Sequence, residues 1–123
     1  MAEPNRTFSI KQGDLLPVLR GRIFDKETGV GQDLTGADLV FHMKNIETGE
    51  LLVEAPAVAD PDQVTNIGWW EYEWQPGDTG PYSDPDVDET LSFKGEIQAT
   101  YGTKPLTSPN TTHFTIKMRN QLN

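Results

Sequence analysis

The amino-acid sequence predicts an all-β protein: one immunoglobulin-like β-sandwich of about seven antiparallel strands, formed by residues 1–123 as a single domain. Three observations lead to this prediction. Apolar residues recur mostly at every second position, which is the period of a half-buried strand. Segments rich in Gly, Pro, Asn and Asp separate these runs at the spacing of a sandwich. No window of a dozen residues shows a capped helical stripe. A small barrel is the second choice.

The first two predicted strands are TFSIK, residues 7–11, and PVLRGRIFD, residues 17–25. The third strand alternates, with Leu39, Phe41 and Met43 on one face and polar or smaller residues between them. A register slip of one residue would expose this apolar set, so we expect it to face the core. The residues between, His42 included, are expected to face outward.

The fourth predicted strand, residues 51–58, is weaker because Pro56 interrupts it. The fifth is WWEYEW, residues 69–74, whose alternation separates a core face from an acidic face. The residues expected in the core are Trp70, Tyr72 and Trp74. The residues expected on the outside are Trp69, Glu71 and Glu73.

The last two predicted strands are LSFKGEIQATY, residues 91–101, and HFTIKMR, residues 113–119. Both alternate over a full strand length, and the final strand is expected to complete the sheet. The residues expected to face inward are Phe93, Gly95, Ile97, Ala99, Tyr101, Phe114, Ile116 and Met118.

Composition limits the partners and the chemistry. A net charge of -9 repels phosphates and anionic membranes, so we expect neither nucleic acid nor membrane as a partner. The sequence contains no Cys, which removes thiol catalysis and disulfides. It contains no apolar run of about 18 residues and no secretory h-region near its start, so synthesis in the cytosol is expected.

An acidic loop excursion is predicted around residues 80–90, between the tryptophan strand and the next one. Its alternating acids Asp84, Asp86 and Asp88 are a weak candidate for a calcium site. The spacing departs from a calcium loop, because the sixth position from Asp84 is Glu89 in place of glycine. A solvated turn is the favoured alternative. We predict no cofactor.

Catalytic groupings are also weak. The histidines are His42 and His113, and neither lies near a nucleophile motif such as G-x-S-x-G. Glu71 and Glu73 would lie about 7 Å apart on one strand face, but nothing nearby indicates the apolar pocket that would keep one of them protonated. We therefore predict that the chain is not an enzyme.

Two aromatic residues are candidates for binding. An outward Trp69 would anchor a protein interface or stack on a sugar ring, although packing beneath a neighbouring loop explains it equally well. Loops as long as the one around residues 80–90 often contact partners, which adds Tyr82 and Asp86 to Trp69 as interface candidates.

The order of segments resembles a known family. The informative pieces are the residues 11–14 (KQGD) with Pro17, the residues 33–37 (DLTGA), the residues 74–79 (WQPGDT), and Pro109-Asn110 before the last strand. Together they resemble the N-terminal domain family of phage baseplate upper proteins, including short stand-alone relatives. The resemblance implies an immunoglobulin-like sandwich that serves as an assembly part. The stretch 82–90 is longer than that family's connection.

The resulting hypothesis is a bacteriophage virion structural or adaptor protein of the tail or baseplate, made in the host cytoplasm. Its partners would be other phage virion proteins, with a homo-oligomer possible. One alternative is a carbohydrate-binding module for host-surface recognition, with Trp69 or Tyr82 as its stacking platform. Another is a head or neck decoration protein.

Overall fold

The computed structural model describes residues 7–24, 27–80, 82, 90–108 and 114–119, and these residues form eight β-strands. The strands are β1 Thr7–Lys11, β2 Leu19–Arg22, β3 Asp38–Asn45, β4 Leu51–Ala59, β5 Trp69–Tyr72, β6 Thr90–Tyr101, β7 Lys104–Ser108 and β8 Phe114–Arg119. No helix occurs within these ranges. The predicted all-β class is therefore confirmed.

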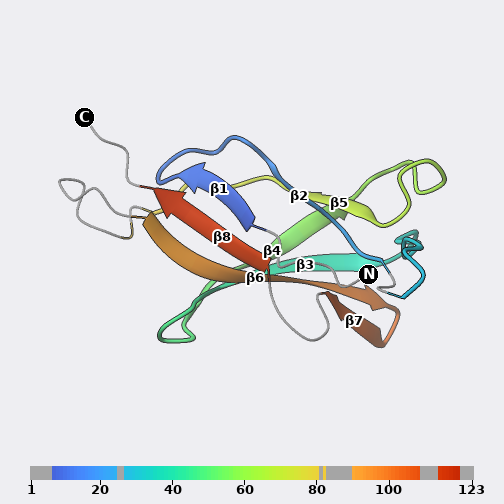
Figure 1. Ribbon diagram of the computed structural model, residues 1–123. Coiled ribbons are helices and arrows are strands. Elements are labelled where there is room, and N and C mark those ends of the chain that lie inside the picture. Colours follow the sequence, from blue (N-terminus) through green and yellow to red (C-terminus); the bar gives the residue numbers. More distant parts are fainter. Residues whose placement is uncertain (1–6, 25–26, 81, 83–89, 109–113, 120–123) are drawn as a thin grey trace.

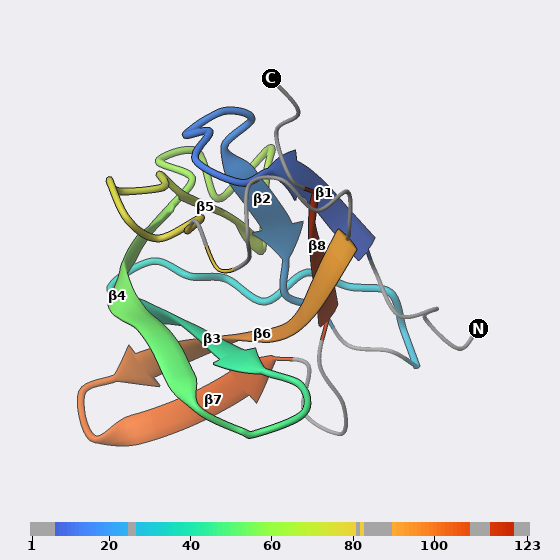
Figure 2. The ribbon, with the colours of Figure 1, turned by 90° about the vertical axis from the view of Figure 1, so that its left-hand side faces the viewer.

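The predicted two-sheet sandwich is wrong: the strands form one mixed sheet that nearly closes into a barrel (Figure 1, Figure 2). The sheet order is β1-β8-β6-β3-β4-β5-β2, with β7 also paired to β6. The physical cause is that the long strands β4 and β6 each pair with different strands along their length. β4 pairs with β3 through residues 51–57 and with β5 at Val58 and Ala59. Backbone pairing therefore continues around the corner at which a sandwich would have a break.

Strand direction and strand number also differ from the prediction. β1 pairs with β8 in parallel, which the period-two pattern could not reveal because it is the same in either direction. β7 was not predicted as a strand. It follows β6 through a two-residue turn with Gly102 at φ 66°, as hairpins with glycine at the first loop position require.

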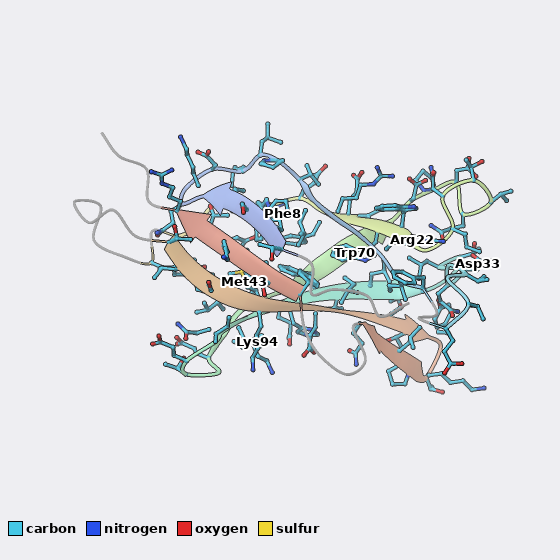
Figure 3. All side chains as sticks on the ribbon, viewed as in Figure 1. Phe8, Arg22, Asp33, Met43, Trp70 and Lys94 are labelled. Atoms are coloured by element: carbon cyan, nitrogen blue, oxygen red, sulfur yellow. The ribbon has the colours of Figure 1, made fainter. Side chains whose placement is uncertain are left out.

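The predicted inward faces are confirmed. Phe41, at the centre of β3, is fully buried, and its ring centroid lies 4.8 Å from that of Tyr72 and 5.8 Å from that of Trp74. Figure 3 shows Met43 and Trp70 between the layers of the barrel and Lys94 on its outer side. Leu34, which precedes β3, is buried in the core cluster as well. The period-two pattern therefore identified which residues fill the barrel, although not its closure.

β1 and β2 are the two ends of the sheet order, and contacts of the β1 end with the chain that follows β5 help to bring these ends together. The Phe8 ring of β1 lies 6.0 Å from the Trp74 ring, centroid to centroid. Just after β1, the Gly13 N–H donates to the hydroxyl and the carbonyl of Thr79, each at 3.1 Å. The turn after β1 is thus tied to the chain that follows β5.

Candidate functional site

Trp69 lies on the outward face of β5 and is half-buried. The guanidinium carbon of Arg20, on β2, lies 4.6 Å from the Trp69 ring centroid. The same guanidinium lies 3.6 Å from a carboxylate oxygen of Glu71 and 3.6 Å from one of Asp60. We call these four residues the Arg20 cluster. One face of the Trp69 ring is therefore already covered by a cation, an interaction worth about 0.5–1 kcal/mol at an exposed site.

Tyr82 is half-buried and belongs to the packing of the barrel end. Its ring centroid lies 5.1 Å from that of Phe93, and its hydroxyl donates to the main-chain carbonyl of Asp78. Its N–H donates to Oε1 of Gln12 at 2.7 Å. The contacts described for Tyr82 share no residue with those of Trp69, and the third interface candidate, Asp86, lies outside the described residues.

Asp78 organises the turn that follows β5. Its Oδ2 accepts hydrogen bonds from the Tyr72 hydroxyl and, at 2.8 Å, from the Gln75 N–H. Burial raises the pKa of Tyr72, and the nearby Asp78 carboxylate raises it further. Burial and Asp78 raise the pKa of Tyr82 in the same way. Both phenols therefore stay protonated at neutral pH and act as hydrogen-bond donors that hold the turn.

The remaining candidates for chemistry are dispersed. His42 Nε2 lies 3.2 Å from a Glu54 carboxylate oxygen across β3 and β4, while His113 lies outside the described ranges. Within those ranges no group of three or more His, Cys, Asp or Glu side chains is placed to hold a metal ion. The calcium candidates Asp84, Asp86 and Asp88 fall outside them, so that prediction stays a prediction.

A groove of about 340 Å³ opens where β4 separates from the segment that follows β5. We call it the β4–β5 groove. Its lining residues are Ala55, Pro56, Val58, Glu71, Tyr72, Glu73 and Gln75. The apolar members come mainly from β4, where Val58 is 68% exposed, and the carboxylates come from residues 71 and 73. The groove thus combines an uncovered apolar floor with an acidic rim.

Pro56 sits inside β4 without ending it, which corrects the predicted break. The Asp60 N–H donates to the Trp69 carbonyl, so residues 60, 58 and 56 direct their backbone groups toward the β5 side by the alternation of an antiparallel ladder. Pairing with β5 stops at Val58. The donor that proline lacks would therefore point to an unpaired edge, where its loss costs the sheet nothing.

Pro105 lies inside β7 in the same way, with its nitrogen directed away from the neighbouring strand. Tyr101 and Lys104 flank the two-residue turn and pair with each other, so the next residue directs its nitrogen away from β6. The part of β4 that β5 leaves uncovered and the outer edge of β7 thus each carry a proline without a donor. Such prolines protect a sheet from indiscriminate pairing with other strands.

Several large apolar side chains remain exposed at fixed positions of strands and turns. They are Leu15, Leu16, Val30, Ile46, Leu51, Val58 and Val64. The most exposed is Val64, at 94%. Val58 lines the β4–β5 groove.

Sequence reasoning missed two polar side chains that organise the turns. Gln63 is buried, and its Oε1 accepts hydrogen bonds from the Leu34 and Gly68 N–H groups, each at 3.0 Å. No pattern around Gln63 indicates this role. Asp78 had a signal in the turn QPGD, but the signal indicated only that a strand ends there.

The chain matches no protein-family model, no curated protein and no solved structure. Among the described residues, no helix is long and apolar enough to cross a membrane.

Proposed function

We propose that the chain is a structural or adaptor protein of a bacteriophage virion, located in the tail or baseplate, and that it acts by protein-protein assembly. The order of segments in the sequence supports this proposal. So does one feature of the surface: Val58 and its groove lie beside an edge that Pro56 blocks. A module that assembles with chosen partners needs apolar side-chain contacts and must avoid indiscriminate strand pairing.

The proposed partners are neighbouring virion proteins, together with further copies of the chain arranged around a symmetry axis. Repetition around a ring multiplies weak contacts, so each contact can be small. A net charge of -9 favours neighbours with basic surfaces.

Quantitative mass spectrometry of density-gradient-purified particles tests this function. We expect the chain in fixed stoichiometry with tail proteins and immunogold label at the tail tip. Absence from the particles would overturn the proposal, and label on the capsid would replace it with the head or neck decoration alternative. Saturable glycan binding that Trp69→Ala abolishes would favour the carbohydrate-binding alternative instead.

Light scattering of the purified chain across a concentration series, with and without calcium, tests how it assembles. A discrete ring-sized oligomer supports self-assembly as the mechanism. A monomer under every condition rejects self-assembly and assigns the contacts to other virion proteins.

A further inference from the structure

We infer that the β4–β5 groove docks an arginine side chain that an extended segment of a partner protein presents. This inference rests on the proposed assembly function, because it names the chemistry of one contact between this chain and a neighbour.

The floor of the groove fits the aliphatic part of a long side chain. Pro56 and Val58 are two residues apart and lie on the same exposed face of β4, while Ala55 and the buried Tyr72 line the gap beside them. Val58 is 68% exposed and therefore leaves apolar surface in contact with water. A stem of methylene groups covers such a surface while its charged head stays at the rim.

The rim fits a cation. The Glu73 carboxylate has no ion pair or hydrogen bond among the described residues, and the Glu71 carboxylate has only Arg20, at 3.6 Å, on the side of β2. Glu71 lies on β5 and Glu73 directly follows it; both side chains are exposed and line the groove. The charge of the whole chain, -9, adds to the local negative potential.

Arginine fits this rim better than lysine. A guanidinium is planar and weakly hydrated, so it gives up water more readily when it lies on an apolar floor. It also presents several N–H donors in a fixed fork, which can address two carboxylates at once. A lysine ammonium is a compact and strongly hydrated charge that would remain in solvent.

The groove selects a side chain over a pairing strand. Pro56 has no N–H and directs its nitrogen into the gap, so a ladder that continued β5 along β4 would lack a hydrogen bond at its centre. Contacts between side chains must therefore carry the recognition.

The test is an amide chemical-shift titration of the full chain with the peptide Ac-Ser-Val-Arg-Val-Ser-NH2. We expect saturable shifts at the amides of Val58, Glu71 and Glu73. Replacing the peptide's arginine by citrulline keeps its shape and removes its charge, and should weaken binding about tenfold. Equal binding of the two peptides, or no saturable shift, would overturn the inference.

Two variants and one control locate the contact. Glu73→Gln should weaken peptide binding about fivefold or more, and Val58→Ser should weaken it about threefold. Glu50→Gln makes the same change in net charge, but it lies just before β4, about 25 Å away along the strand. It should leave binding within about twofold of the parent chain, since the long-range field of one surface charge is screened.

Equal weakening by Glu73→Gln and Glu50→Gln would show general attraction of a cation and would overturn the docking site. Spectra of both variants that are unchanged away from the groove show that the fold is intact. The titration is independent of the particle analysis. If the chain is present in virions but does not bind the peptide, only the docking inference is overturned. If it binds the peptide but is absent from virions, the proposed function is overturned.

Discussion

The two faces of residues 69–74 lie in different environments. The inner face consists of Trp70, Tyr72 and Trp74, which are 2–3% exposed and pack against aromatic rings of β1, β3 and β8. On the outer face, Trp69 lies under Arg20 while Glu71 and Glu73 are exposed. Neighbours in sequence thus belong to different physical environments.

The difference separates stability from recognition. Inner side chains contribute dispersion and apolar burial that the fold needs, and each fits between fixed neighbours. Outer side chains make contacts that are individually weak, because water screens exposed charges. Substitutions on the inner face should therefore test the fold, and substitutions on the outer face should test the function.

The largest expected effect is that of Trp74→Ala on the inner face. Removing this ring leaves a cavity among Phe8, Phe41 and Tyr72, and should lower the free energy of unfolding by about 3–5 kcal/mol. Urea denaturation measures the loss. Trp74→Phe is the matched control: the Trp74 Nε1 is buried and has no hydrogen-bond partner among the described residues, so a phenylalanine keeps part of the packing and removes this donor. It should cost clearly less than the alanine.

Gly21→Ala tests the packing of the inner face from β2, where Gly21 pairs with Trp70 of β5. A Cβ at residue 21 would stand 2.6 Å from Cζ2 of Trp70, which is closer than two carbon atoms can approach. We expect a loss of about 1–3 kcal/mol in thermal or urea unfolding. The pair Gly21→Ala with Trp70→Phe should cost less than the sum of the single changes, because the smaller ring makes room. Simple additivity would show that the clash relaxes by another route.

Much of this inner face could be predicted from the sequence. Alternation placed Phe41, Ile97, Ile116 and Met118 in the core, and all four are buried. Alternation is a local property, however, whereas closure depends on which strands pair. Nothing local indicates that β6 serves β8 and β7 on one edge, or that β1 runs parallel to β8. The sandwich was predicted for this reason.

The outer face was predicted less completely. The outward direction of Trp69, Glu71 and Glu73 followed from the period of the strand. The groove did not, because it forms where β4 and the chain after β5 diverge, and Ala55 and Tyr72 are far apart in sequence. Arg20 over Trp69 is likewise a contact between strands whose pairing the sequence does not specify.

Tyr72→Phe tests the inner side chain whose hydroxyl donates a hydrogen bond to Asp78. It removes the hydroxyl that donates to Asp78 and should cost about 1.5–3 kcal/mol, the usual range for a hydrogen bond to a charged group. The raised pKa of Tyr72 also predicts a pH dependence. The phenol ionises more easily in the unfolded chain, so this stability is fully present below the ordinary tyrosine pKa of 10.0 and declines as the pH rises above it.

The parent chain should therefore lose stability in urea titrations above about pH 10 more steeply than Tyr72→Phe does. Some slope should remain in the variant, because the pKa of Tyr82 is also raised. Parallel slopes for the two proteins would mean that the Tyr72 hydroxyl is not buried against Asp78.

The smallest effects are expected on the outer face, where Glu73→Ala should change the free energy of unfolding by no more than about 0.5 kcal/mol. Trp69→Ala removes a ring that Arg20 covers on one side. Loss of this cation–π contact should lower the free energy of unfolding by about 1 kcal/mol or less, in addition to the loss of the ring's partial burial. Both are measured by urea denaturation beside Trp74→Ala. A loss for Trp69→Ala as large as that for Trp74→Ala would place Trp69 in the core and end the distinction between the faces. Small losses would show instead that the outer face is available for recognition, because the fold does not depend on it.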